Sequence, residues 1–290
     1  MRHKKAEVKL DNIGTWSQAK HAVIQQYVAV YTQILSTKKY FKFHYIDGFC
    51  GAGETTSKDT GETLKGSPQY ALETEFPFTS YYFIDSNKGK TEHLRQICDE
   101  DYSDRNIHIK TGNSNEIIKE ILSKFSYKRY DRVLCLLDPY GLHLAWDVIV
   151  QLGRLGKSEG KGIVDIMINF PIMDINRNYG QIDPSAVPKE DPRMDIFWGD
   201  DSWYPLLYKK TGLFDAEEKV DYKRLVIAYC ERLKKEAGFV YVPKPAKLTN
   251  TKNAPLYYFC FATHNDIANN VMTHLSNAIE NRLANQQRRR

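Results

Sequence analysis

Apolar residues recur along this chain at two spacings, one typical of helices and one typical of buried strands. Positions 16, 23, 27, 30 and 34 fall at helical spacing and predict an N-terminal helix over residues 15–36. Lys20 and His21, near its start, are expected at the surface. Beyond this helix, short apolar runs alternate with polar loops and helical segments. This alternation predicts an α/β fold whose parallel strands are joined by right-handed crossovers.

Five apolar runs are candidate parallel strands, and they cover residues 41–46, 80–85, 107–110, 132–137 and 162–169. The fourth is continuously apolar after Arg132, as expected of a central strand that is buried on both faces. Two later runs, 238–242 and 256–262, are separated by a polar connection, which predicts an antiparallel hairpin at the sheet edge. The sheet and its helices are therefore expected in residues 41–171 and 220–283.

Residues 172–219 interrupt this pattern. They contain Pro184, Pro188 and Pro192, few periodic runs and several aromatic residues. An insertion that follows the end of a strand can cover a ligand site and supply substrate specificity, so we expect a cap here. Trp198 and Trp203 fit a small core within this cap better than platforms for stacking a base.

A glycine-rich segment follows the first predicted strand. Asp47 ends the apolar run, and Gly51 and Gly53 come shortly after it. Glycines allow positive φ and let backbone N–H groups approach a bound small molecule, while Asp47 can accept hydrogen bonds from a cationic or hydroxylated ligand. An ordinary β-turn would also explain these glycines. The polar residues 54–66 are expected to form an inserted loop, and Ser67 is expected to cap the helix that follows.

Polar residues also follow the next three predicted strands. Asp85 ends the second strand, where nucleotide sites commonly place an acid that binds the ribose hydroxyls. Asn113 follows the third, where it either faces a ligand or only caps a helix. Asp138, Pro139 and Tyr140 follow the fourth, where they form either a simple turn or a site that binds a substrate amino group and stacks on its plane. Because the carboxyl ends of parallel strands share one edge, we expect these residues to lie together.

Composition and charge add three expectations. The chain has 290 residues, 42% of them hydrophobic, and no apolar run approaches the ~18 residues of a membrane span, so we expect a soluble cytoplasmic protein without a membrane partner. Its five cysteines are far apart and lie mostly in apolar runs, which predicts reduced core residues and no bound metal. The net charge of +5 comes from the tails. Of the 41 basic residues, six lie at 2–5 and 288–290, and the remaining 35 nearly balance the 36 acidic residues. Such tails permit nucleic-acid binding without indicating it.

Several motifs resemble those of class I S-adenosylmethionine-dependent methyltransferases. Residues 47–53, with the sequence DGFCGAG, are similar to the D-x-F-x-G-x-G loop on the methionine side of the cofactor. Asp85 matches the acid that binds the ribose, and Asn113 matches the residue that reads the adenine amino group, which is usually Asp. Asp138-Pro139-Tyr140 resembles the D-P-P-Y motif of amino-group methyltransferases but lacks the second proline.

This resemblance implies a Rossmann-like sheet of five parallel strands with an edge hairpin and helices on both faces. It also implies a set of residues that bind S-adenosylmethionine, namely Asp47, Phe49, Gly51, Gly53, Asp85 and Asn113.

More closely, the chain resembles the bacterial three-Cys-motif partner proteins. The resemblance rests on Trp16 with Lys20, the 47–53 loop, residues 66–68, 83–85, 112–115 and 138–141 with Trp146, and Phe197-Trp198-Gly199. These markers span most of the sequence and imply one methyltransferase-like domain over residues 1–290. The family is named for a presumed partner, a radical S-adenosylmethionine protein that carries three cysteines, and it does not specify the substrate.

The predicted function is methyl transfer from S-adenosylmethionine to an amino nitrogen or similar nucleophile, with a nucleic acid or modified nucleotide among the candidate acceptors. Asp138 and the Pro139 carbonyl would orient the acceptor lone pair and Tyr140 would stack on it, since alignment supplies most of the rate. The alternatives are a nucleotide-binding module and a subunit that scaffolds the radical enzyme. An NAD-dependent oxidoreductase is disfavoured, because Thr56 stands where G-x-G-x-x-G requires glycine or alanine.

Overall fold

The computed structural model describes residues 8–180, 191–208, 222–249 and 255–288, without the side chains at 15, 16, 18, 19 and 279–288. The chain divides into two compact units. Unit 1 comprises the residues up to Asp138 together with Gly156–Ile166, and unit 2 comprises Pro139–Leu155 and the residues from Met167 onward. The Trp16 side chain, the basic side chains of both tails, and residues 181–190 and 209–219 of the expected cap lie outside the described part of the chain.

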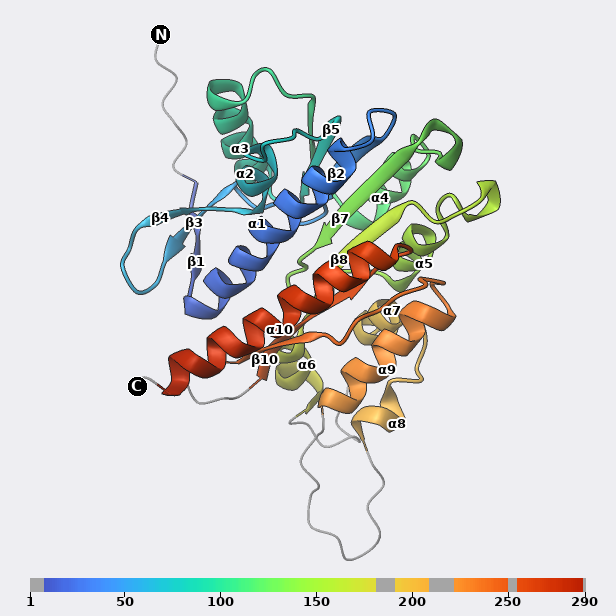
Figure 1. The fold of residues 1–290 in the computed structure, drawn as a ribbon. Helices are drawn as coiled ribbons and strands as arrows, with labels where there is room; N and C mark the ends of the chain where they lie inside the picture. The colour runs from blue at the N-terminus through green and yellow to red at the C-terminus, as the bar shows by residue number, and fades with distance from the viewer. Residues whose placement is uncertain (1–7, 181–190, 209–221, 250–254, 289–290) are drawn as a thin grey trace, which may run out of the picture. The chain divides into compact units, whose positions relative to one another are not determined.

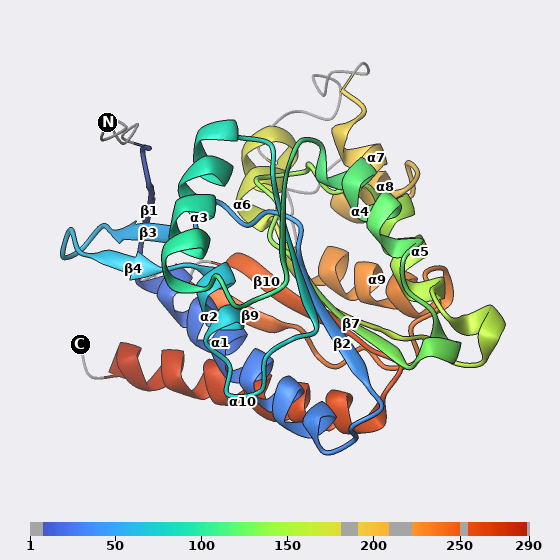
Figure 2. The same ribbon diagram turned by 90° about the horizontal axis from the view of Figure 1, so that it is seen from above.

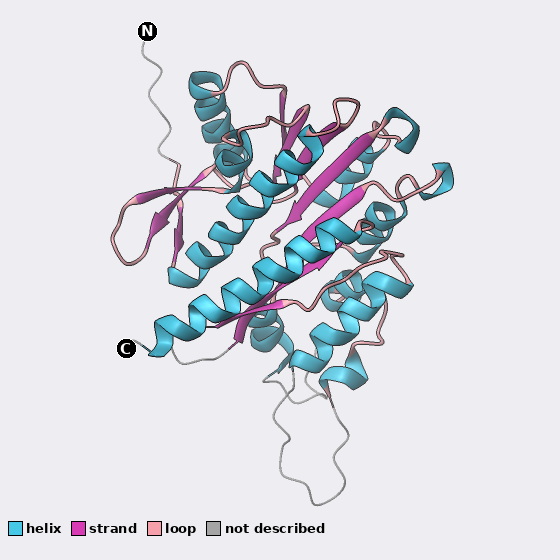
Figure 3. Ribbon diagram, in the orientation of Figure 1, coloured by secondary structure: helices cyan, strands magenta, loops and turns pink. Residues whose placement is uncertain are grey.

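The sheet of unit 1 is parallel. Its strand order is β6 (Ile107–Thr111), β5 (Ser80–Asp85), β2 (Lys42–Asp47) and β7 (Asp131–Leu137), and the first residues of β8 (Val164–Phe170) also belong to this unit. Strands alternate with helices along the chain (Figure 3). β7 is almost entirely buried, as its continuous apolar run predicts for a central strand.

Helices lie on both faces of the unit 1 sheet. Figure 2 shows α1 (Thr15–Ser36) on one side of β2 and β7, and α4 (Ser114–Leu122) on the other. α2 (Ser67–Leu72) and α3 (Lys88–Asp101) complete the unit. The buried face of α1 includes Val23, Ile24, Tyr27 and Val28, each at most 3% exposed. This apolar stripe follows the helical period, so burial against the strands fixes the rotation of α1 about its axis.

A second, small sheet in unit 1 replaces the inserted loop that we expected over residues 54–66. β3 (Glu54–Ser57) and β4 (Thr63–Lys65) form an antiparallel hairpin, and β1 (Asp11–Ile13) pairs in parallel with β3. The expectation of a loop was wrong because these short strands carry polar and threonine-rich sequence, without the apolar alternation that marks a half-buried strand.

Unit 2 contains the rest of β8, followed in the sheet by β10 (Pro255–Ala262) and β9 (Ala246–Thr249). β9 and β10 are antiparallel, so the predicted edge hairpin is confirmed. Its first strand is not residues 238–242, however, where only Tyr241 forms an isolated bridge. Pro243 and Pro245 follow that run, and since proline donates no ladder hydrogen bond, regular pairing begins only at Ala246.

The helices of unit 2 are α5 (Trp146–Arg154), α9 (Tyr222–Lys235) and α10 (Asp266–Arg288), drawn in green, orange and red in Figure 1. Its described part of 172–219 holds α6 (Ile172–Ile175), a π-helical turn (Asn176–Gly180), α7 (Arg193–Trp198) and α8 (Tyr204–Leu207). Trp203 is 5% exposed and packs against Tyr179 and Tyr208 of this segment, as expected of a small core within the cap. Trp198 is 1% exposed but packs against Tyr229 of α9, so its core is not confined to the cap.

The predicted fold class, a Rossmann-like α/β fold with a mostly parallel sheet and an antiparallel edge hairpin, is confirmed. Within the described ranges, no helix is both long enough and apolar enough to cross a membrane.

Candidate cofactor site in unit 1

The strand register brings three carboxylates to one edge of the unit 1 sheet. Asp47 ends β2 and pairs with Phe83 of β5 on one side and Leu136 of β7 on the other. Asp85 lies two residues beyond Phe83, and Asp138 lies two residues beyond Leu136. Because all three strands run in the same direction, these acids follow one another along the carboxyl-terminal edge.

Asp47 is fully buried and its carboxylate has two described donors, both neutral. The Ser67 hydroxyl donates to it at 2.6 Å and the Phe49 N–H at 3.2 Å. Burial raises the pKa of Asp47 to about 7, although these two hydrogen bonds oppose the rise and the nearby Asp138 and Asp85 add to it. Near neutral pH this site would therefore be stabilised by a cation that restores the charged carboxylate.

Asp85 shapes the glycine loop. Its two oxygens accept hydrogen bonds from the N–H groups of Gly51 at 3.0 Å and Asn87 at 2.8 Å, and the residue is 7% exposed. Gly51 has a φ of +63°, and a Cβ there would meet only Asp11, at 4.0 Å. Gly51 thus faces open space, as a glycine that admits a ligand should.

Gly53 serves a different purpose from Gly51. It has a φ of +79°, and a Cβ at this position would lie 2.6 Å from Leu94 Cδ1 of α3. The adjoining Gly66 donates its N–H to the Gly53 carbonyl at 2.7 Å. We therefore attribute Gly53 to close packing of the loop, whereas the sequence pattern alone assigns both glycines to the cofactor. Phe49, which begins the loop, is half-buried.

Asn113 is an exposed helix cap. Its side-chain oxygen accepts from the Asn115 N–H at 3.0 Å, and its amide lies 3.5 Å from Glu116. The helix that it caps begins at Ser114, whose hydroxyl donates to the Gly48 carbonyl beside the glycine loop. β6 pairs with β5, so Asn113 follows the strand next to the one that ends in Asp85. The sequence left two roles open for Asn113, ligand contact and helix capping, and its observed contacts are those of a helix cap.

Lys20 is a residue of this site that the sequence did not reveal. It lies on α1, is 7% exposed, and its ammonium forms an ion pair with the Asp138 carboxylate. The expectation that Lys20 lies at the surface was wrong. Its position, three and four residues before Val23 and Ile24, continues the buried stripe of α1, and a lysine in such a stripe signals a buried partner.

His21, beside Lys20, is half-buried and packs edge-on against Tyr70. Burial lowers the pKa of His21 to about 4, with a further lowering by Lys20 and a partial offset by Asp138. His21 is therefore a neutral imidazole at physiological pH, and the local positive charge belongs to Lys20.

Ser67 also differs from its expected role. α2 begins at Ser67 with Gly66 as its N-cap, so the Ser67 hydroxyl does not cap the helix. It donates instead to Asp47, as described above. A serine at the first position of this helix can reach Asp47 because the Gly53–Gly66 contact holds the start of α2 against the glycine loop.

Pro139 and Tyr140 begin unit 2, directly after Asp138 in the chain. Pro139 is buried and the Tyr140 ring is 57% exposed. The next residue, Gly141, has a φ of +62°, and a Cβ there would lie 2.6 Å from the Asp174 carboxylate. The turn after Asp138 is thus tightly packed within unit 2 and needs glycine.

Two other chemistries receive no support. Cys50 in the glycine loop is buried, and burial raises the pKa of its thiol well above the ordinary value, which disfavours a nucleophilic thiolate. Among the described side chains, no three or more His, Cys, Asp or Glu residues are close enough together to hold a metal ion.

No protein-family model matches the chain, and no curated protein matches it. Among solved structures, it is similar to protein LPL1258 from Legionella pneumophila, of family DUF519, with 9% identity, 90% of each chain covered and a TM-score of 0.54. It is less similar to Trm1 from Pyrococcus horikoshii in complex with S-adenosyl-L-methionine (15% identity, TM-score 0.44, 87% of this chain and 57% of that one).

A third similar structure is the magnesium protoporphyrin IX methyltransferase ChlM from Synechocystis PCC 6803 with bound cofactor (11% identity, TM-score 0.38, 90% of this chain and 87% of that one). The likeness to LPL1258 concerns the fold alone, and the two weaker ones carry no argument about this chain.

Proposed function

We propose that this protein is an S-adenosylmethionine-dependent methyltransferase that acts on an amino nitrogen or a similar nucleophile. One observation carries the proposal. Asp47 and Asp85 end two neighbouring parallel strands, Asp138 directly follows a third, and Gly51 lies open beside them. Ligands of open α/β sheets bind at this edge, outside the carboxyl ends of the strands.

The residues of unit 1 suit the chemical groups of this cofactor. Asp47 would hold its ammonium, directly or through water, and gain a charge partner that Ser67 and Phe49 do not provide. Asp85 would hold the ribose hydroxyls while it keeps the loop in place. Phe49 and Gly51 would form the wall on the methionine side, and Gly53 would support that wall by letting the loop pack closely against Leu94. Bound there, the cofactor supplies an electrophilic methyl group on a sulfonium.

Asn113 would contact the adenine end of the cofactor. Its side chain is exposed on the capped end of α4, and its amide has both a donor and an acceptor to offer to a base. This contact requires that the ligand replace or share the hydrogen bonds that Asn113 makes within its own helix cap.

The acceptor would bind at Asp138. The Asp138 carboxylate and the Pro139 carbonyl would accept hydrogen bonds from its amino group, and the exposed Tyr140 ring would stack on its plane. The Lys20 ion pair keeps the Asp138 carboxylate in one orientation, which makes Lys20 a positioning residue. Asp138 can also accept the proton that the acceptor nitrogen releases. Alignment of this kind, and not acid–base chemistry, supplies most of the rate.

We extend the proposal to membership of the three-Cys-motif partner proteins and to a cytoplasmic role beside a radical S-adenosylmethionine protein. The order of the markers from Lys20 to Gly199 supports it. A nucleic acid or modified nucleotide is the acceptor class that we favour, because a tyrosine that follows an amino-binding aspartate by two residues in the sequence suits recognition of a base.

A second function is a subunit that binds the cofactor or a nucleotide, or scaffolds its partner, without methyl transfer. The Lys20–Asp138 ion pair favours it, because this pair already occupies the carboxylate that an acceptor amine would need. The two functions differ in whether binding leads to turnover.

The test is to incubate the purified chain with labelled S-adenosylmethionine and pools of RNA, DNA, nucleotides and protein, and to measure S-adenosylhomocysteine. We expect product from at least one pool with the wild type and with Asp101→Ala, an exposed control. We expect none with Asp138→Ala, although this variant should still bind the cofactor. Cofactor binding without product from any pool, with and without the partner, would favour the second function.

A further inference from the structure

A basic and aromatic surface lies at the other end of the unit 1 strands. It consists of two segments, 38–42 and 127–132, which together hold six basic residues, four aromatic residues and one acid. β2 and β7 bring the segments together, since Lys42 pairs in register with Asp131 and donates its N–H to the Tyr130 carbonyl. In Figure 1 this is the end of β7 away from its arrowhead. We call it the Tyr40–Tyr130 surface.

Two tyrosine rings stand at the centre of this surface. Tyr40 and Tyr130 are 54% and 52% exposed, and their ring centroids are 5.0 Å apart in an edge-on arrangement. Behind them, the Arg132 guanidinium lies over the Phe41 ring at 4.4 Å and over the Tyr127 ring at 5.3 Å. A single exposed aromatic ring needs no explanation, but here two exposed rings lie together within a cluster of cations.

The backbone at Tyr130 is strained. Its φ of +59° is the one positive value among the non-glycine residues that the structure describes. Bulky residues rarely adopt this conformation, and it persists only where the surroundings impose it. The residue in this costly conformation exposes its ring beside that of Tyr40, which points to a role for the ring itself.

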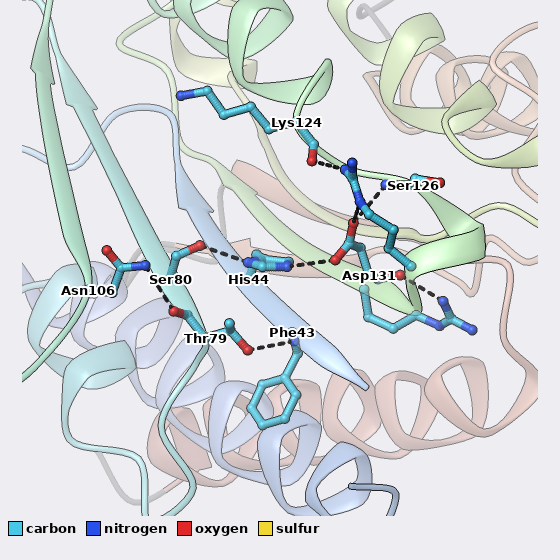
Figure 4. Close-up of polar contacts among 10 residues, drawn as sticks. Phe43, His44, Thr79, Ser80, Asn106, Lys124, Ser126 and Asp131 are labelled. Carbon is cyan, nitrogen blue, oxygen red and sulfur yellow. Dashed lines mark hydrogen bonds and ion pairs between the residues drawn. The ribbon is translucent and has the colours of Figure 1, made fainter. Parts of the chain in front are cut away.

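A buried network anchors the second segment (Figure 4). His44 lies between Ser80, at 2.7 Å from Nδ1, and Asp131, at 3.3 Å from Nε2. Asp131 also accepts from the Ser126 N–H at 2.8 Å and from Arg129 at 3.3 Å. Ser80, His44 and Asp131 have the order of a hydrolase triad, but each is at most 7% exposed, so no substrate reaches them. Their role is to fix the base of the surface.

The charge that this surface presents to solvent is positive. Lys38, Lys39, Lys42, Lys128 and Arg129 are exposed, whereas the single acid of the two segments, Asp131, is buried in the network. One acid outside the segments, Glu159, accepts a hydrogen bond from the Ser126 hydroxyl at 2.6 Å, and Lys157 and Lys161 lie two residues to either side of it in the chain. The body of the chain is nearly neutral, so this concentration of cations is local.

We propose that the Tyr40–Tyr130 surface binds single-stranded nucleic acid. Cations that follow a phosphate backbone, interleaved with aromatic rings on which bases stack, are the features that bind single strands without reading their sequence. An acidic protein would use the cations but would gain little from two outward rings. Lys42 and Asp47 bound β2, so this surface lies roughly 17 Å from the candidate cofactor site at ~3.3 Å per strand residue. It would anchor a strand, and the proposal does not depend on methyl transfer.

The test is fluorescence anisotropy with labelled RNA and DNA single strands of about 12 nucleotides and a duplex of equal length, without cofactor, at about 50 to 200 mM salt. We expect either single strand to bind more tightly than the duplex. Lys39→Ala/Lys128→Ala should weaken binding and reduce the salt slope by about 1.4, at roughly 0.7 for each phosphate that is no longer neutralised. The matched control is Lys234→Ala/Lys235→Ala, which removes two exposed lysines from α9 in unit 2.

The aromatic contribution is tested separately. Tyr40→Ala should weaken binding roughly tenfold, while Tyr40→Phe, which keeps the ring, should bind like the wild type. The basic tails are intact in every variant and cannot account for these differences. The proposal is overturned if no single strand binds, if the two double-lysine variants bind equally well, or if Tyr40→Ala binds like Tyr40→Phe. An acidic peptide that competes as well as the oligonucleotide would also overturn it.

Discussion

Replacing Asp47 with asparagine should make the protein more stable at alkaline pH. The folded protein holds a proton on Asp47 up to a pKa of about 7, whereas the unfolded chain releases it near 3.8. Between these values the folded state binds the extra proton, so each rise in pH favours unfolding. This contribution to stability is fully present below pH 3.8 and is lost as pH rises through about 7.

The magnitude follows from the two pKa values. Linkage gives a loss of about 2–3 kcal/mol in the free energy of unfolding between pH 5 and pH 8 from this one group. Asparagine has nearly the same shape and can still accept the Phe49 N–H and contact the Ser67 hydroxyl, but it carries no charge. The cost of ionisation within the core should therefore disappear in the variant.

The assay is urea unfolding of the wild type, Asp47→Asn and Asp101→Asn at pH 5, 6, 7 and 8. The difference in stability between Asp47→Asn and the wild type should grow by about 2–3 kcal/mol from pH 5 to pH 8, and Asp101→Asn, an exposed control, should follow the wild type. A constant difference between the Asp47→Asn and wild-type curves over this range would refute the reasoning.

Three further predictions concern the same site. Gly53→Ala should lower the free energy of unfolding by about 2 kcal/mol or more in urea titrations, whereas Gly61→Ala, with a similar positive φ but nothing within 4 Å, should lose only about 1 kcal/mol. Lys20→Met should lower the free energy of unfolding by about 1–3 kcal/mol and should lower turnover at least tenfold. The affinity for the cofactor, measured by calorimetry, should not change. Turnover equal to that of the wild type would show that Lys20 does not position Asp138. If Asp47 holds the cofactor ammonium, the affinity for S-adenosylmethionine should rise between pH 6 and pH 8, because Asp47 loses its proton over this range. This rise should be absent in Asp47→Asn.

The fold was predictable because its signals are local. β2, β5 and β7 are apolar runs that end on or just before a carboxylate. Once these strands pair in parallel, their register places the three acids at one edge of the sheet. The hairpin was predicted with the wrong first strand, because the apolar run 238–242 looks like a strand in isolation. The two prolines that follow it settle where regular pairing begins.

The finer geometry of the site was not predictable, because it depends on contacts between distant segments. Nothing in the sequence around Lys20 pairs it with Asp138, 118 residues away. Likewise, Gly51 and Gly53 are equivalent in the motif, and only the position of Leu94 on α3 separates an open glycine from a packed one. The sequence offered one signal for Lys20, its position within the apolar stripe of a helix. A lysine in such a position should be counted as part of the buried face of the helix.

The central claim is that S-adenosylmethionine binds at the carboxyl edge of the unit 1 sheet, and isothermal titration calorimetry tests it most directly. We predict a binding isotherm for the wild type and for the exposed control Asp101→Ala. We also predict an affinity about tenfold weaker or more for Asp85→Ala, because this variant cannot form a charged hydrogen bond to the ribose. Circular dichroism would establish that the variants are folded. Equal affinity for the wild type and Asp85→Ala, or no heat of binding with any of the proteins, would contradict the claim.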